Sequence, residues 1–423
     1  MPPAPTNWTI VTITSPDHGG WVPSPNSRGT MGIIWPCLST LGLCLWSMVH
    51  LNVPATRDTS LTIILRKLRW LLIGLLAPEL VMMFAFAQRT SAEQSVADMA
   101  ALGHRDWTRT HGFYADGGGF ELLAAGCAQP FPLTAKQLAY LVQHGFVDMP
   151  KITRRQINDK SKADGLAKAL AFVQAGWFGT QLVGRAAQGL GITPFELITS
   201  ALVLCSFTSL GLWWEKPLDV QTPTRLHAKQ DVSAILIQAG EAARTCWSET
   251  PLDFVESNTY WSSKLSKGVT RLILRWDMQK RPLDRIPNDR DYHPRSFKQN
   301  MYLAVPVSAF VTIHLLAWNI SLPTAAEQFL WRINCIIMSL ALHVHCVSEA
   351  VGFWWTGYAV GSLDLWGGYK KRLPWSLVFI GLAAVYSASR LCMLIEGVIS
   401  LRDLPETAFR ETTWSQFLPR IGS

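Results

Sequence analysis

The sequence predicts an all-α protein: a polytopic membrane helix bundle of about seven transmembrane helices with two helical extramembrane segments. Three observations lead to this prediction. Hydrophobic residues make up 49% of the 423 residues, whereas charged residues make up only 16%. The chain holds 19 tryptophans, a residue enriched where membrane proteins meet the lipid–water interface. Several stretches are apolar over a length sufficient to cross a hydrocarbon core of about 30 Å.

The first such stretch is Met31–Val53, which contains no Asp, Glu, Lys or Arg. A secretory signal peptide would combine a basic head, a shorter apolar run and a small-residue cleavage site. Residues 1–27 lack these features, so we expect Met31–Val53 to be a membrane span.

Six further stretches are apolar enough to be spans, and two of them leave the helix count open. Leu166–Ala187 carries Lys168 and Arg185 near its ends. Phe329–Tyr358 is long enough for one tilted helix, or for a span followed by an interfacial continuation. A count of six or eight is therefore an alternative to seven. The six stretches are Trp70–Gln88, Leu166–Ala187, Ile192–Trp214, Met301–Asn319, Phe329–Tyr358 and Leu373–Leu401.

These spans divide the chain into seven parts. They are a polar N-terminal tail (1–30), helices 1–2 (31–88), an amphipathic extramembrane segment (89–165), helices 3–4 (166–215), a basic extramembrane segment (216–300), helices 5–7 (301–402) and a C-terminal tail (403–423). With seven helices, the N-terminus and both extramembrane segments share one face of the membrane. We expect that face to be cytosolic, although the basic Asn52–Arg69 loop favours the opposite orientation.

The extramembrane segments are expected to be helical rather than disordered. Thr134 and Thr153 are suited to be N-caps of amphipathic helices, and further helical pieces are expected around Asp231–Cys246 and Ser263–Trp276. The basic run Lys264–Arg295 and the formal net charge of +8 suit an anionic lipid surface. Membrane lipid is therefore an expected partner, whereas no nucleic-acid-binding module is recognisable.

Two further features concern the compartment. The sequons at Asn7 and Asn319 make the chain a candidate glycoprotein. Six cysteines lie in expected spans, where they act as small packing residues. Cys127 and Cys246 are the loop pair, and a disulfide between them would require a lumenal location.

A set of short strings spread over most of the chain resembles an uncharacterised family of multi-pass integral membrane proteins from filamentous fungi. The strings are Arg28-Gly29-Thr30, Trp35-x-Cys37, Cys44, Trp46, His50-Leu51-Asn52-Val53-Pro54, Ala77-Pro78-Glu79, Phe113-Tyr114, Gly118-Gly119-Phe120, Asp159-Lys160-Ser161-Lys162-Ala163-Asp164, Lys216-Pro217-Leu218-Asp219-Val220, His314, Glu327-Gln328, Leu330-Trp331-Arg332, Arg390, Glu396, Leu401-Arg402 and Leu404-Pro405. The resemblance implies a fungal source, and we expect an integral membrane protein of the endoplasmic reticulum or another endomembrane. It also implies a place near natural-product biosynthetic genes, but no established activity.

Ionisable residues within the spans are the candidate site residues, because a charge in hydrocarbon is costly and usually faces a cavity or a partner. Glu79 follows Pro78 inside one expected span, and Arg390 lies in the middle of the last one. They either form a structural pair that locks two helices, or Glu79 is an acid or base whose pKa is set by burial.

His345 and Glu349 lie four residues apart and share a helix face, with His343 and Cys346 on a neighbouring face. Zinc or copper is one interpretation of this set. The resembled family has a Cys after His314 and a His near Glu327, and both are missing here. We therefore favour residues that line a polar cavity, and we expect no metal and no other cofactor.

Another pattern, His111-x4-Asp116, matches that of glycerolipid acyltransferases, in which the histidine is a base. Two residues at a fixed spacing are common by chance, and the companion phosphate-binding motifs are missing. Nucleotide-binding, serine-hydrolase and thioredoxin motifs are not found either.

Two functional hypotheses follow. In the first, Glu79, His314, His345, Glu349 and Arg390 carry out cofactor-free acid–base catalysis, such as a cyclisation or isomerisation, on a lipophilic small molecule of the terpenoid or polyketide class. In the second, the same residues line a pathway or join helices, and the protein is a transporter, channel or scaffold without catalytic activity. Catalysis predicts that the five side chains converge on one enclosed pocket.

Overall fold

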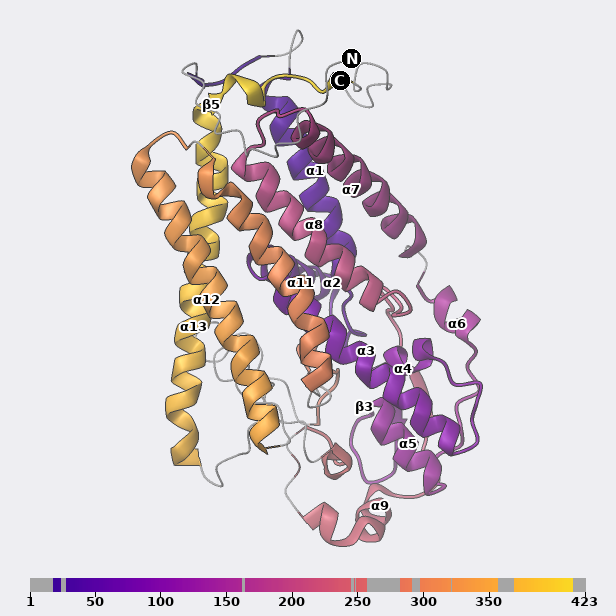
Figure 1. Cartoon of the computed structure of the whole chain (residues 1–423). Coiled ribbons are helices and arrows are strands. Elements are labelled where there is room, and N and C mark those ends of the chain that lie inside the picture. Colours follow the sequence, from indigo (N-terminus) through magenta and orange to yellow (C-terminus); the bar gives the residue numbers. More distant parts are fainter. Residues whose placement is uncertain are drawn as a thin grey trace, which may run out of the picture.

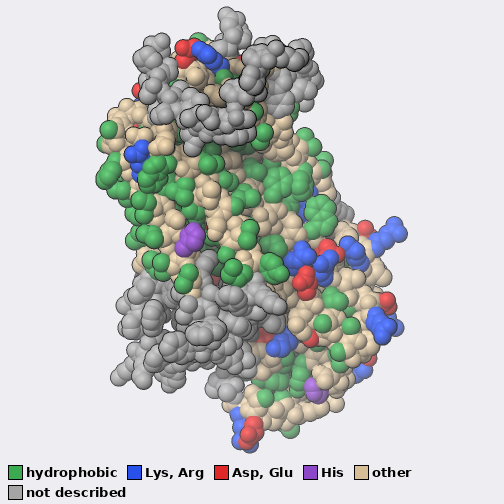
Figure 2. Space-filling model, viewed as in Figure 1, with side chains coloured by type: hydrophobic (Ala, Val, Ile, Leu, Met, Phe, Trp, Pro, Cys, Tyr) green, Lys and Arg blue, Asp and Glu red, His purple; other side chains and the backbone are tan. Residues whose placement is uncertain are grey.

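The computed structural model describes residues 18–23, 28–161, 164–244, 247, 249–256, 282–290, 297–320, 322–356 and 369–413. The protein is mostly helical, at 66%, as the sequence predicts. Figure 2 shows hydrophobic side chains spread over the helix bundle, whereas charged side chains concentrate on the region beside and below it. This division of the surface is that of a membrane protein with an extramembrane part.

Long helices form the bundle and lie side by side (Figure 1). They are α1 (Thr30–Met48), α7 (Asp164–Ala187), α8 (Pro194–Leu212), α11 (Phe297–Leu316), α12 (Ala325–Thr356) and α13 (Tyr369–Ile399). Helix α1 packs against α7 and α8, and α8 packs in turn against α11. Helices α11, α12 and α13 then form a consecutive row.

Within the described residues, four helical stretches are long and apolar enough to cross a membrane: Thr30–Met48, Pro194–Leu212, Met301–Asn319 and Gly381–Arg402. A fifth is added if the bent pair α2–α3 counts as one span. Helices α7 and α12 form where spans are expected, but polar residues such as Gln174 and Arg332 interrupt their apolar character. Four to five candidate spans are thus supported, and about seven stays a prediction.

The expected span Trp70–Gln88 is not one continuous helix, because the chain breaks in its middle. Helix α2 (Ser60–Leu76) ends before Ala77, and α3 (Pro78–Ala101) begins at Pro78, with a bend of 111° between them. Proline has no backbone N–H and disfavours helical angles at the residue before it. Ala77 accordingly has φ −142° and ψ 66°, outside the helical region.

Both arms of this bent pair are anchored at the same end of the bundle. On the α2 side, Lys67 pairs with Asp219 at 3.0 Å and Arg57 pairs with Asp284. On the α3 side, Gln88 donates to the Asn288 carbonyl at 3.1 Å. These contacts favour a re-entrant hairpin over a single broken span, and we refer to the α2–α3 pair as the re-entrant hairpin, with its apex at Ala77–Glu79.

The two ends of the bundle hold different segments from those that the predicted topology groups together. At one end of the bundle, β1 (His18–Gly19) pairs with β5 (Leu404–Pro405). At the other end lies the extramembrane region, with α5 and α9 (Figure 1). Strand β1, which precedes α1, and the extramembrane region therefore lie at opposite ends of the bundle, whereas the seven-helix prediction puts them on one face of the membrane.

The extramembrane region contains α4 (Arg109–Asp116), α5 (Ala135–Gln143), α6 (Arg154–Asp159) and α9 (Val232–Ala239). It also contains a three-stranded sheet, which the all-α prediction did not include. Strand β2 (Phe120–Leu123) pairs antiparallel with β3 (Phe131–Leu133) and parallel with β4 (Thr224–His227). Strands this short carry too few residues for alternation to be recognised in the sequence.

Both predicted threonine N-caps are confirmed. Thr134 accepts from the Gln137 backbone N–H at 3.2 Å, and Thr153 accepts from that of Gln156 at 3.3 Å. Asp231 is the N-cap residue of α9, although no side-chain hydrogen bond forms there. The helix expected over Ser263–Trp276 lies outside the described residues.

Short 3₁₀ segments complete the fold: η1 (Gly240–Arg244), η2 (Asp253–Glu256), η3 (Ala317–Asn319), η5 (Ser400–Arg402) and η6 (Glu406–Ala408). Cys37, Cys44, Cys205 and Cys335 are buried free thiols, and Cys127 is also free. Cys246 and the Asn7 sequon lie outside the described residues.

Candidate functional site

Glu79 lies at the apex of the re-entrant hairpin, inside the bundle. It is the second residue of α3 and only 3% exposed. The Tyr386 hydroxyl of α13 approaches its carboxyl group, and Arg390 acts on it electrostatically. No direct ion pair joins Glu79 to Arg390, although both are described, so the structure shows an electrostatic influence and not a contact between them.

Arg390 is completely buried and contacts α11. Its guanidinium donates to His314 Nε2 and lies 5.1 Å from the centre of the Phe310 ring. Arginine has only donors, so His314 Nε2 must accept and Nδ1 must carry the proton. Nδ1 donates it to the Phe310 carbonyl at 2.8 Å. His314 is thus neutral and engaged at both nitrogens, which suits a residue that positions Arg390 rather than one that transfers protons.

The cluster keeps buried polar atoms that lack a well-formed hydrogen bond. They are Glu79 Oε2, Tyr386 Oη, and Arg390 Nε and Nη2. Their surroundings are apolar, with Met82, Cys205 and Met393 in the same core. Buried polar groups without partners are rare, because leaving them unsatisfied costs about 1–3 kcal/mol each. Within the described residues, the cluster thus brings a carboxyl, a phenol and a guanidinium into one apolar core with hydrogen-bonding capacity that their neighbours do not use.

Tyr386 is the member that the sequence did not single out. It precedes Arg390 by four residues, so both side chains project from the same face of α13. This spacing could have identified Tyr386 from the sequence, since a hydroxyl group one helical turn from a charged residue in a span lies in the same environment as that charge. Its partner on α3 is not apparent from sequence.

The side chains of His345 and Glu349 lie outside the described residues, so their part in the site stays a prediction. Their backbone positions on α12 are described. Cys335 of that helix contacts the His314 carbonyl at 3.5 Å. With a rise of about 1.5 Å per residue, His345 lies about 15 Å further along the axis than Cys335. Among the described residues, no group of His, Cys, Asp and Glu gathers to hold a metal ion.

A second buried cluster lies where the bundle meets the extramembrane region. The Lys216 ammonium donates to the His50 carbonyl at 2.9 Å, to Asn52 Oδ1 at 3.0 Å and to Gln88 Oε1 at 2.8 Å. Trp213 also donates to Gln88 Oε1, at 3.0 Å. Residues of two of the strings quoted above, His50-Leu51-Asn52-Val53-Pro54 and Lys216-Pro217-Leu218-Asp219-Val220, meet here.

Burial changes the acidity of the ionisable groups near this junction. It lowers the pKa of Lys216 to about 7, against the opposing attraction of Asp116. Burial also raises the pKa of Asp116 to about 7, against the stabilising backbone N–H of Ala135, which donates to Asp116 Oδ1 at 2.9 Å. The junction thus holds two groups whose charge states change near neutrality.

The His111-x4-Asp116 pattern does not form a base and its orienting carboxylate. His111 Nδ1 accepts from the Thr108 backbone N–H at 3.1 Å, and its Nε2 donates to the Ile152 carbonyl at 2.9 Å. Asp116 instead accepts from Ala135. Both residues therefore hold local structure around α4.

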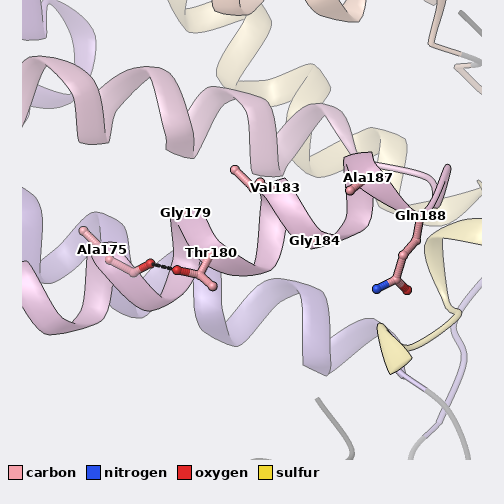
Figure 3. A pocket seen from close by; sticks show the side chains of 8 residues that line it. Ala175, Gly179, Thr180, Val183, Gly184, Ala187 and Gln188 are labelled. Atoms are coloured by element: carbon pink, nitrogen blue, oxygen red, sulfur yellow. Dashed lines mark hydrogen bonds between the residues drawn. The ribbon is translucent and has the colours of Figure 1, made fainter. Parts of the chain in front are cut away.

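An open groove of about 560 Å³ runs along the outer face of α7 (Figure 3). Its lining residues are Ala175, Gly176, Gly179, Thr180, Val183, Gly184, Ala187 and Gln188. The Thr180 hydroxyl donates back to the Gly176 carbonyl at 2.8 Å. No ionisable group lines this groove, so it offers no acid–base chemistry.

Comparison with known proteins places the chain in a family without assigning an activity. A model described as a family of unknown function, DUF8562, matches residues 8–244. No curated protein and no solved structure matches the chain. The matched region includes Glu79 and Lys216, whereas His314, Tyr386 and Arg390 lie beyond it. Because the match covers more than half of the sequence, the protein belongs to this family of unknown function.

Proposed function

We propose that the protein is a membrane-embedded, cofactor-free acid–base enzyme that acts on a lipophilic small molecule. The observation that carries the proposal is the convergence of Glu79, Tyr386 and Arg390 in the bundle core, with polar atoms still available to a ligand. These residues come from a hairpin apex and a distant helix. Placing ionisable side chains at membrane depth costs free energy, so they are found mostly at functional sites.

The cluster suits an isomerisation or cyclisation that needs no external reagent. Glu79 as a carboxylate takes a proton from a carbon next to a substrate carbonyl. Arg390 Nε and Nη2 stabilise the negative charge that develops on the carbonyl oxygen. The proton returns at another carbon, from Glu79 or through the Tyr386 hydroxyl, so that atoms and charge balance. His314 holds the Arg390 guanidinium in place.

The substrate class follows from the site and from the sequence resemblance. An apolar core within the bundle favours a molecule that partitions into the bilayer. A terpenoid or polyketide intermediate of fungal specialised metabolism, in the endoplasmic reticulum or another endomembrane, is the expected case. His345 and Glu349 remain proposed members of the same site.

A transporter or channel is the second candidate, and one observation favours it. Discontinuous helices whose ends meet in the membrane interior are typical of transporter binding sites. The α2–α3 break places the N-terminus of α3 and Glu79 in that position. In this case Glu79 would bind and release a proton or a cation without altering a substrate.

The test compares wild type with Glu79→Gln in proteoliposomes supplied with candidate lipophilic intermediates. We expect product formation to fall by about 100-fold or more, because general acid–base catalysis contributes on that order. Membrane insertion, followed by fractionation and thermal unfolding, should be unchanged. Glu93→Gln is the matched control, because Glu93 lies on the same helix but is exposed.

Equal turnover by the Glu79 variant and wild type would remove Glu79 from the mechanism. Uptake of an unaltered compound that is lost in Glu79→Gln would favour the transporter. Metabolite profiles of a strain that lacks the gene would then identify the compound.

A further inference from the structure

Helix α2 exposes apolar side chains along one face. Leu61, Ile64, Leu65, Leu68 and Leu72 are 46–65% exposed. At 100° per residue these five positions fall within about 100° of the helix circumference. A soluble protein buries such a stripe, since it is the face that normally packs on a core.

The opposite face of α2 is the one that packs against the protein. Lys67, Trp70 and Gly74 are its buried residues. A Cβ placed on Gly74 would lie 2.6 Å from the end of the Met48 side chain of α1, so the two helices approach closely there. The polarity of α2 is therefore inverted, with leucine outside and lysine inside.

None of the five positions of the apolar stripe carries a charge, and two of the basic residues of α2 lie off the stripe in ion pairs. Arg66 pairs with Asp58 at 2.6 Å, and Lys67 pairs with Asp219 at 3.0 Å. The third basic residue, Arg69, lies half-buried beside the stripe. An aqueous surface or a charged partner would not suit this face.

Helix α2 packs beside a helix that itself exposes apolar side chains. Helix α1 is a candidate membrane span and exposes Trp35, Leu38 and Trp46. On the buried face of α2, the Lys67 ammonium lies 3.8 Å from the centre of the Trp46 ring, which joins the two helices at this point. The apolar stripe of α2 therefore lies beside a helix that is itself apolar enough to cross a membrane.

We propose that the exposed face of α2 contacts the acyl chains of the bilayer, so that α2 is the lipid-facing arm of the re-entrant hairpin. The bend of 111° sets α2 across the direction of α3. An amphipathic helix in this orientation buries its apolar face in the membrane without crossing it. The inference is independent of the catalytic proposal, because it concerns where the helix lies and not what Glu79 does.

The test places a photo-crosslinking residue at Leu65 or Leu68 of the full-length protein in phospholipid vesicles. Mass spectrometry then identifies what each position captures. We expect phospholipid adducts at both positions, at a yield comparable with that from Trp35 of α1. Trp70, on the buried face, should give intramolecular adducts, and Lys136, exposed on α5, should give no lipid adduct.

Two positions are tested so that the experiment still gives a result if one of the two variants fails to fold. Adducts to a second copy of the chain would overturn the proposal and assign the face to a dimer interface. Adducts to a distant segment of the same chain would overturn it as well, because that segment would cover the stripe. Absence of lipid adducts at both positions, with capture retained at Trp35, would show that α2 lies outside the bilayer.

Discussion

At the scale of single residues, Lys216 and Arg390 are two buried cations whose hydrogen bonds go to neutral acceptors, unlike Arg290, which pairs with Glu249 and Glu256. The Lys216 ammonium has three donors and finds three neutral acceptors, and it makes no ion pair in the described structure. Arg390 likewise donates to a neutral imidazole. Neutral acceptors satisfy the hydrogen-bond donors of a buried cation. They compensate only poorly for the free energy of hydration that the cation loses on burial.

Lys216 predicts a specific dependence of stability on pH. Its pKa is about 7 in the folded protein and 10.5 in the unfolded chain. Between these values the unfolded chain binds the proton that the folded protein has released, so the free energy of unfolding rises with pH. The rise is at most about 1.4 kcal/mol per pH unit. In Lys216→Met this contribution is lost, and Tm measured at pH 7 and pH 10 should increase less than in wild type.

Lys136→Met provides the control, because Lys136 is exposed on α5. Titration of other groups affects both variants and cancels in the comparison. An identical pH response of Lys216→Met and wild type would show that the Lys216 pKa is not lowered.

At the scale of elements, helix ends decide where the site is placed. Pro78 begins α3 and releases the chain from α2, which brings Glu79 into the core. In the extramembrane region, Thr134 and Thr153 begin α5 and α6 as capping boxes. The two caps differ in burial, since Thr134 is 1% exposed and also donates to Glu256, whereas Thr153 lies in the solvent.

This difference predicts unequal effects of cap removal. Thr153→Ala should cost about 1 kcal/mol, the usual value for an exposed cap. Thr134→Ala should cost about 2 kcal/mol or more, because it also removes a buried hydrogen bond to Glu256, whose carboxylate keeps its ion pair with Arg290. Amide hydrogen exchange at Gln156 and Gln137 measures each helix separately. Thr153→Ser and Thr134→Ser should keep most of the protection, and equal losses in both alanine variants would contradict the role of burial.

At the scale of the whole molecule, the re-entrant hairpin determines which segments share a face. The β1–β5 pair and the Arg28–Glu196 ion pair lie at one end of the bundle. The Lys216 junction and the extramembrane sheet lie at the other. A chain that turns back at Ala77 reverses the expected relation between the N-terminus and the segment that begins at residue 89.

Protease protection of epitope tags tests this topology in sealed membranes. A tag at the N-terminus and a tag inserted beside Lys136 should differ, with one cleaved and the other protected. A tag after Thr413 should behave like the N-terminal one, because β5 pairs with β1. Equal accessibility of the N-terminal and Lys136 tags would restore a crossing between Trp70 and Gln88.

Local features of the structure were predictable from sequence. Apolar runs predicted helices α1, α8, α11 and α13, and two threonines predicted helix starts, because both signals act over a few residues. The cost of a charge in hydrocarbon marked Glu79, His314 and Arg390 as residues that need partners. Of these, the structure brings His314 and Arg390 into direct contact.

Only the tertiary structure decided which partners these residues contact. Pro78 in the sequence allows either a kinked span or a reversal, and the contacts of Lys67 with Asp219 and of Gln88 with Asn288 favour the reversal. Tyr386 joins the cluster, and Lys216 finds its acceptors, only when segments more than a hundred residues apart pack together. Periodicity and composition report the local environment of a residue. Partners distant in sequence are set by the packing of the whole bundle, which those local signals do not contain.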